Sequence, residues 1–216
     1  MQVKRFNNYS GWLGINKQSG ISSAKIVYKI KKMINIKKVG HAGTLDPLAT
    51  GVLPIALGEA TKTIKYAMHS YKSYEFDISW GIATETEDLE GKVISSSSIR
   101  PTKIEITNAL PKFIGKIRQK PPLYSAIKID GIRSYKLARK SIKIDIPERD
   151  VFIKSFKLLK EIDENKARFV VECSKGVYIR SLARDLALYL NTFGHISYLK
   201  RLSVGSFLYK DAILLA

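Results

Sequence analysis

The chain has 216 residues, 45% of them hydrophobic, which suffices for one large domain with a sizeable core or for two small domains packed closely. This composition excludes a disordered chain, and one cysteine with three histidines excludes a disulfide framework and a zinc site. Lys and Arg number 37 against 19 Asp and Glu, so the formal net charge of +18 predicts a polyanionic partner, with nucleic acid as the first candidate.

The basic charge is unevenly distributed. Residues 1–70 carry eleven Lys or Arg and two acids, whereas residues 71–100 carry six acids and three bases. An AT-rich genome, which favours Lys and Ile codons, is a partial explanation, but the uneven spread argues against codon bias alone. The start of the chain lacks an apolar signal-peptide core and no apolar stretch is long enough to span a bilayer, so we expect a cytoplasmic protein with no membrane partner.

The first predicted helix begins after Ser22, a suitable N-cap. Its apolar residues recur at helical spacing, at Ile26, Val27, Ile30, Met33 and Ile34, while Lys25, Lys29 and Lys32 line another face. That lysine face is interpreted either as a solvated surface or as a surface that faces phosphates. The next apolar run, GVLPIALG at residues 51–58, predicts a buried strand, and Pro54 places it near an edge or a bulge.

Residues 72–81, KSYEFDISWG, alternate apolar and polar side chains and predict a half-buried strand. A polar excursion follows, and residues 106–117 predict a short helix interrupted by Pro111. Residues 119–150 are rich in Lys, Arg, Tyr, Pro and Gly without sustained periodicity, which predicts an extended surface segment with contacts of its own.

The last clear elements are a strand over residues 167–180, ARFVVECSKGVYIR, and a helix over residues 180–191. The strand alternates Phe169, Val171 and Cys173 against polar or smaller neighbours, and the helix repeats Leu182, Leu186 and Leu190. Strands mixed with helices predict an α/β or α+β sheet protein. No linker clearly divides the chain, so we expect one domain over residues 1–216.

Asp46 is the one carboxylate in GHAGTLDPLATGVLP, residues 40–54, among three glycines and two prolines. An isolated Asp-Pro usually starts a helix or a turn, with the Asp as its cap, and that interpretation stays open for Asp46. The glycines allow close backbone approach to a ligand, and His41 is a flat ring able to stack on or wedge beside a base. A single carboxylate with no metal ligands or partner acid nearby retains one strong chemical use, as a nucleophile.

The segment GHAGTLDPLATGVLPIALGEATK resembles the signature of the bacterial tRNA pseudouridine synthases of the TruB type. Further segments are similar to that family in the same order: INKQSGISS, KSYEF, QKPPLYSAIKIDGIRSYKLAR, CSKGVYIRSLARDL and YLKRLSVGSF. Together they cover nearly the whole chain. The resemblance implies the pseudouridine synthase fold, a mixed and mainly antiparallel sheet flanked by helices and loops, with a thumb-like RNA-binding segment at about residues 120–150.

The implied reaction converts the uridine conventionally numbered 55, in the T arm of tRNA, to pseudouridine. Such an isomerisation requires no cofactor, energy source or metal, and the chain has no GxxxxGK[ST] or strand-linked GxGxxG motif. By the family's pattern Asp46 attacks either the sugar C1′ or the base C6 of a flipped-out uridine, and the sequence leaves both routes open. Tyr74 would stack on the uracil, and His41 would help to evict the base.

The resemblance implies four further roles around the reacting uridine. Burial would disfavour the carboxylate anion of Asp46, and the guanidinium of Arg180 would favour it. We expect Tyr178, two residues earlier, to share a strand face with Arg180 and to line the pocket. Apolar packing against the base is assigned to Leu199, and phosphate or loop support to Lys17 and Lys62.

Two departures from the family's pattern bear on the expectations. The acidic loop has Glu85 where the family usually has Asp. Bacterial members commonly continue into a small C-terminal RNA-binding domain of the PUA type, which we expect to be absent from this chain. We expect a monomer that binds the T-arm stem-loop through phosphates and unpaired bases.

Three alternative functions remain. A guide-RNA-directed synthase shares the Asp loop, but LATGVLPIALGEATK favours the stand-alone bacterial type. A non-catalytic RNA chaperone or ribosome-associated binder would not need to keep Asp46, Tyr74 and Arg180. A basic structural protein, with a charge set by genome composition, would bind tRNA weakly or without salt dependence.

Overall fold

The computed structural model describes residues 7–140, 142 and 144–215. Backbone contacts divide the chain into two compact units: unit 1 comprises residues 1–75 and 199–216, and unit 2 comprises residues 76–198. The boundary between the units falls within strands β4 (Lys72–Trp80) and β12 (Gly194–Val204). Mixed sheets and helices confirm the predicted α+β class.

Unit 1 is built on a mixed sheet with the strand order β14–β1–β3–β12. The central pair is antiparallel along its full length, from Gly11 opposite Leu57 to Lys17 opposite Gly51, and β12 adds to β3 in parallel. The other strands and helices of this unit complete it: β1 (Gly11–Lys17), α1 (Ser23–Met33), β2 (Val39–His41), β3 (Thr50–Leu57), η1 (Gly58–Thr63), α2 (Ile64–His69), β13 (Phe207–Leu208), η3 (Tyr209–Asp211) and β14 (Ile213–Leu214).

Helix α1 begins where the sequence predicts it to begin. The hydroxyl of Ser22 accepts a hydrogen bond from the backbone N–H of Lys25, which confirms Ser22 as the N-cap. Ile26 and Ile30 are buried, as expected, whereas the Met33 side chain is 60% exposed. The apolar stripe therefore ends one turn earlier than predicted, because the helix itself ends at Met33.

The apolar run around Pro54 forms a buried strand, but its predicted position at an edge is wrong. Strand β3 lies between β1 on one side and β12 and β2 on the other. Its pairing with β12 ends at Gly51, and its pairing with β2 begins at Ile55. Pro54 lies between these two pairings, at a position where no strand pairs with this side of β3. Proline has no backbone N–H, so no strand-to-strand hydrogen bond is lost there.

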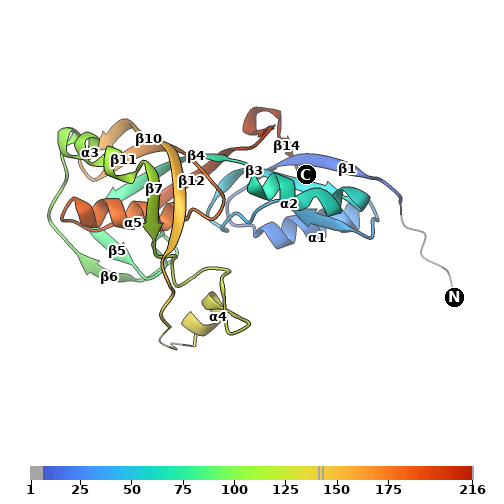
Figure 1. Ribbon diagram of the computed structural model, residues 1–216, viewed down its shortest axis with the longest axis horizontal. Helices are drawn as coiled ribbons and strands as arrows, with labels where there is room; N and C mark the ends of the chain where they lie inside the picture. The colour runs from blue at the N-terminus through green and yellow to red at the C-terminus, as the bar shows by residue number, and fades with distance from the viewer. Residues whose placement is uncertain (1–6, 141, 143, 216) are drawn as a thin grey trace. The chain divides into compact units, whose positions relative to one another are not determined.

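Unit 2 contains a sheet with the strand order β12–β4–β11–β10–β7 and two small hairpins (Figure 1). The alternation that predicts strands β4 and β11 is confirmed, because Phe76, Ile78, Phe169 and Val171 are fully buried. The remaining elements are β5 (Ile82–Thr84), β6 (Val93–Ser96), α3 (Lys103–Ala109), η2 (Leu110–Phe113), β7 (Gly115–Gln119), β8 (Lys128–Ile129), β9 (Ile132–Arg133), α4 (Ser134–Ala138), β10 (Arg149–Asp163), β11 (Lys166–Cys173) and α5 (Ile179–Tyr189).

Two predictions in unit 2 are corrected. The helix predicted over residues 106–117 begins earlier, at Lys103, because Thr102 and Glu105 form a capping box, and Gly115–Gln119 is a strand that pairs with β10. The segment over residues 119–150 is not wholly extended, since it carries the β8–β9 hairpin and α4. Figure 1 shows α4 standing away from the sheet. Residues 141 and 143 lie outside the described residues.

Helix α5 packs its apolar face into unit 2, with Leu182 and Leu186 fully buried. It begins at Ile179 and ends at Tyr189, so Leu190 lies just beyond its last turn. Over the described residues, no helix is long and apolar enough to cross a membrane.

Candidate active site

Asp46 lies on a short irregular connection between β2 and β3 in unit 1. The residues that follow it form a turn, closed by a hydrogen bond of 3.1 Å from the N–H of Ala49 to the carbonyl of Asp46, and then enter β3. The predicted turn start at Asp46 is confirmed, whereas the helix alternative is wrong, because no helix begins in this described stretch. Asp46 itself is partly exposed, although Leu45 and Ala49 on either side are buried.

The backbone around Asp46 is hydrogen-bonded at every carbonyl from residue 43 to residue 47. The hydroxyl of Ser23 accepts from the N–H of Leu45 and donates to its carbonyl, both at 2.9 Å. The carbonyl of Pro47 accepts from the ammonium of Lys17 and from the N–H of Gly20. A loop whose polar backbone atoms are satisfied in this way is held in one conformation, and the position of Asp46 is fixed with it.

Arg201 holds the first part of this loop, and no pattern in the sequence marks it. Its guanidinium is buried, with 1% of the residue exposed, and it donates to the carbonyls of Val52 at 2.8 Å and of Gly43 at 3.0 Å. Gly51 makes this approach possible. Its φ is +107°, and a Cβ there would lie 2.6 Å from the backbone nitrogen of Arg201.

His41 forms the end of β2 and is a neutral ring in this environment. Burial, with a smaller contribution from the positive charge of Arg201, lowers the pKa of His41 below its usual value of 6.5. Its Nδ1 is buried and has no hydrogen-bond partner among the described residues. A proton on Nδ1 would be a buried donor without an acceptor. Burial and the missing acceptor therefore both favour the neutral ring.

We expect the stability contribution of His41 to depend on pH. Because its pKa is lower in the folded chain, the unfolded chain takes up the proton first as the pH falls through 6.5. The contribution of His41 to the free energy of unfolding therefore decreases below pH 6.5 and does not change with pH above it. His41→Asn removes this dependence, so melting curves between about pH 5 and about pH 7.5 should show the wild type losing stability relative to the variant on acidification. A constant difference across that range would contradict the assignment.

The other predicted residues of unit 1 have distinct environments. Tyr74 and Leu199 are buried, at 8% and 6% exposed, on β4 and β12. Lys17 is fully buried, and its ammonium donates to the carbonyls of Gln18, Ile21 and Pro47, which is the geometry of loop support rather than of a phosphate contact. Lys62 is exposed on η1 and forms an ion pair of 2.5 Å with Glu59.

Ser23 offers a test of the loop that does not touch the carboxylate. Ser23→Ala leaves a buried N–H and a buried carbonyl of Leu45 without their partner, so we expect a loss of about 2 kcal/mol in the free energy of unfolding. We also expect faster hydrogen exchange at the Leu45 amide. Ser22→Ala is the matched control, because it removes a helix cap worth about 1 kcal/mol on the exposed neighbouring residue. Equal exchange at Leu45 in both variants would argue against this role of Ser23.

Arg180 and Tyr178 belong to unit 2, at the start of α5. The guanidinium of Arg180 is 5% exposed and donates to the carbonyls of Thr86 at 2.8 Å and Tyr124 at 3.0 Å, with its Nε 3.8 Å from a carboxylate oxygen of Asp88. The side chain of Arg180 is therefore held inside unit 2 and is not on its surface. The predicted shared strand face is wrong, because β11 ends at Cys173 and Tyr178 is the N-cap of the helix.

Tyr178 is held at both of its backbone polar groups by Gln119. The amide of Gln119 donates to the carbonyl of Tyr178 at 3.1 Å and accepts from its N–H at 2.8 Å. The tyrosine ring lies 5.2 Å below the guanidinium carbon of Arg149, within the range of a cation–π contact. Gln119 is 1% exposed, and no local pattern in the sequence distinguishes it from a surface glutamine.

The acidic loop between β5 and β6 accommodates Glu85 without strain on its side chain. Glu85 is exposed, and its N–H donates to the carbonyl of Lys92 at 3.0 Å. The anchoring carboxylate is Asp88, which accepts from the hydroxyl of Thr86 and the N–H of Glu90. The longer side chain at position 85 therefore changes the surface of this loop and leaves its anchor in place.

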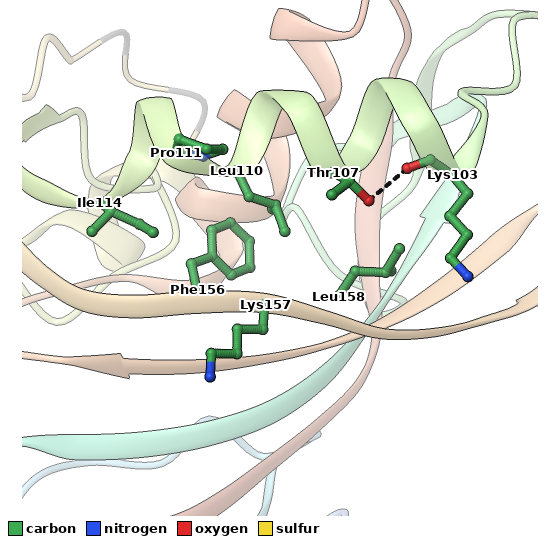
Figure 2. Close-up of a pocket in the computed structure, with 8 residues that line it drawn as sticks. All are labelled: Lys103, Thr107, Leu110, Pro111, Ile114, Phe156, Lys157 and Leu158. Atoms are coloured by element: carbon green, nitrogen blue, oxygen red, sulfur yellow. Dashed lines mark hydrogen bonds between the residues drawn. The ribbon is translucent and has the colours of Figure 1, made fainter.

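A separate groove in unit 2 carries none of these residues. Figure 2 shows it between α3–η2 and β10, with a volume of about 360 Å³ and a lining of Lys103, Thr107, Leu110, Pro111, Ile114, Phe156, Lys157 and Leu158. The hydroxyl of Thr107 donates to the carbonyl of Lys103 within the helix. This lining contains no carboxylate, histidine or cysteine, so the groove is not a candidate for the chemistry of Asp46.

Comparisons with known proteins agree with the motifs. A family model described as TruB family pseudouridylate synthase, N-terminal domain, matches residues 31–179. The chain is 50% identical over 206 residues to a protein of Ehrlichia chaffeensis named tRNA pseudouridine synthase B, covering 95% of this chain and 70% of that relative.

Solved structures extend the likeness to three dimensions. The structure of a Cbf5–Nop10–Gar1 complex contains a chain that matches 96% of this one with a TM-score of 0.74 and 28% identity, and 53% of that chain is covered. A structure of an H/ACA RNP bound to a substrate RNA containing 2′-deoxyuridine matches with a TM-score of 0.71 and 25% identity, covering 94% of this chain and 50% of that one. The predicted pseudouridine synthase fold is thereby confirmed, and the chain belongs to the TruB family of pseudouridylate synthases.

Proposed function

We propose that this chain is a tRNA pseudouridine synthase that isomerises uridine 55 in the T loop, with Asp46 as its nucleophile. One observation carries the proposal: in a member of this family, a single partly exposed carboxylate stands on a loop whose backbone is hydrogen-bonded from residue 43 to residue 47. Catalysis by a nucleophile depends on such fixed placement.

The proposed reaction leaves the elemental composition of the uridine unchanged. Asp46 attacks C1′ of the sugar or C6 of the base, the bond between uracil N1 and C1′ breaks, and the base rotates. A bond then forms between C5 and C1′, C5 releases its proton, N1 takes up a proton, and the carboxylate is regenerated. Nothing is oxidised or reduced, and no group is transferred to another molecule. Substrate and product are therefore isomers, and no co-reactant is needed.

The remaining residues have roles before and during this exchange. The uridine must leave its stack to reach Asp46, so we assign stacking on the uracil to Tyr74 and displacement of the base to neutral His41. We assign contact with the flipped uridine to Leu199 and Tyr178, and stabilisation of the anionic form of Asp46 to Arg180. Lys17 supports the loop from within, and exposed Lys62 is available to a phosphate.

The proposed partner is the T-arm stem-loop of tRNA, bound to a single copy of the chain. The net charge of +18 suits a folded RNA, and RNA loops offer unstacked bases to aromatic side chains. Tyr28 on α1 is 65% exposed among the lysines of that helix, which favours the phosphate-facing interpretation of this surface. A tRNA substrate also fits the expected cytoplasmic location, and we propose that both units act as one catalytic domain.

The test is release of tritium from a T-arm stem-loop labelled at C5 of its uridines. The proposed reaction releases one C5 hydrogen for each uridine converted, without added cofactor. A second stem-loop with cytidine in place of uridine 55 is the control and should release none. Salt-dependent binding of both stem-loops without tritium release would instead indicate a non-catalytic RNA binder. Weak or salt-independent binding would indicate a basic protein without an RNA function.

A further inference from the structure

Arg201 is among the largest fully buried side chains of the described residues. Burying a guanidinium is costly unless its donors are satisfied, so its acceptors indicate what it is there to hold. Nε donates to the carbonyl of Val52 at 2.8 Å, Nη2 to that of Gly43 at 3.0 Å, and Nη1 makes a longer contact of 3.5 Å with that of Thr44. These acceptors flank Asp46 in the chain: Gly43 and Thr44 lie in the loop before it, and Val52 lies in β3 after it.

We propose that Arg201 is the positioning residue of the Asp46 loop: its guanidinium ties the part of the loop before Asp46 to strand β3 after it. This inference rests on the proposed function for its catalytic consequence, and on the geometry of unit 1 for the clamp itself. Arg201 does not contact the substrate in this account, and it acts through Asp46.

The charge of Arg201 is retained by its neighbours. Burial lowers the pKa of Arg201, whereas its hydrogen bond with the Tyr74 hydroxyl and the carboxylate charge of Asp46 raise it. The same positive charge contributes to the low pKa of His41. Arg201 is thus linked electrostatically to three residues that the proposed mechanism uses.

A lysine at this position could not reproduce the clamp. Arginine presents donors in a planar fork, which reaches carbonyls in two directions at once, whereas one ammonium at the end of a flexible chain cannot span from Gly43 to Val52 in the same way. Lysine does retain the positive charge, so Arg201→Lys separates the geometric contribution from the electrostatic one. Arg201→Met removes both.

The alternative is that Arg201 merely cross-links β12 to β3, with no effect on Asp46. Single-turnover kinetics distinguish the two, because the rate constant reports on correctly folded molecules and the amplitude reports on how many there are. We expect Arg201→Met to lower the rate constant of tritium release by about 10²-fold with little change in amplitude, since displacing a reacting group by about 1 Å costs that much. Arg201→Lys should fall between Arg201→Met and the wild type.

Arg100→Met is the matched control. The guanidinium of Arg100 also donates to backbone carbonyls, those of Ser97 at 2.8 Å and Ile99 at 3.0 Å, but in unit 2 and outside the Asp46 loop. Its rate constant should equal that of the wild type. Reduced amplitude with an unchanged rate constant in the Arg201 variants would overturn the proposal, and so would equal rate constants for Arg201→Met and Arg100→Met.

Hydrogen exchange in the absence of RNA tests the clamp independently of the reaction. In Arg201→Lys, which keeps the buried charge and most of the packing, the amides of Ala42, Leu45 and Ala49 should exchange faster while those of α5 are unchanged. Unchanged exchange at the three loop amides would overturn the clamp. A wild type that releases no tritium would refute the proposed function, and the exchange result would still decide whether Arg201 positions this loop.

Discussion

Asp46→Asn is expected to lower the single-turnover rate of tritium release by about 10⁴-fold or more, the order lost when a covalent nucleophile is removed. An amide has nearly the shape of a carboxylate but is far too weak a nucleophile to form the proposed adduct. The hydrogen bonds that hold residues 43–47 go to backbone atoms, so the substitution leaves them in place. The loss should therefore come from chemistry rather than from folding.

The control for this prediction is binding of the same RNA. Affinity for a stem-loop comes largely from phosphate contacts, so Asp46→Asn should bind within a factor of about 3 of the wild type. Leu48→Met alters a partly buried neighbour on the same turn and should keep its rate, which separates the carboxylate from the loop as a whole. An Asp46→Asn variant with a wild-type rate constant would exclude Asp46 as the nucleophile.

Arg180→Lys is expected to lower the same rate constant by about 10²-fold, a loss typical of removing one donor from a developing negative charge. The guanidinium is held by the carbonyls of Thr86 and Tyr124 and lies near Asp88. A lysine ammonium keeps the charge but donates from a single nitrogen, whereas the guanidinium of Arg180 reaches the two carbonyls from Nη1 and Nη2. We therefore expect the charge to be misplaced rather than lost, with a lower rate and a preserved amplitude.

Arg184→Lys is the control for Arg180. Arg184 lies one turn later on α5 and is tied to the same loop through Glu87, with an ion pair of 2.5 Å, but it has no proposed role toward the uridine. Its rate constant should stay within a factor of about 3 of the wild type. If both arginine variants lose rate equally, Arg180 acts by anchoring the loop between β5 and β6, and its proposed role toward Asp46 is wrong.

Local patterns predicted the elements whose burial follows a simple period. Strand β11 alternates over its length, β4 does so except at Asp77, which is buried and paired with Arg168, and α1 begins at its predicted cap. Strand β10 escaped prediction because its pairing with β11 shifts register between Ile153 and Ser155, again between Leu158 and Lys160, and between Glu161 and Asp163. Each shift breaks the period of two on which strand prediction depends.

The residues of the candidate site also differ in whether a local pattern marks them. Asp46 could be predicted because glycines and prolines mark its loop locally, and the family motif supplied its role. Arg201 could not, since its burial depends on carbonyl acceptors about 150 positions away in the chain. The sequence could not decide between phosphate contact and loop support for Lys17 for the same reason, because the carbonyl of Pro47 that it binds lies 30 positions away. Basic residues are usually exposed, so only the folded chain distinguishes these two.

The most direct measurement of the central claim is a nucleoside map of an unmodified tRNA transcript after incubation with the wild-type chain or with Asp46→Asn. Carbodiimide treatment followed by primer extension locates pseudouridine at single-nucleotide resolution. The account predicts one new stop, at uridine 55, with the wild type and none with Asp46→Asn. A transcript that the wild type binds but leaves without pseudouridine, or a stop that persists with Asp46→Asn, would contradict it.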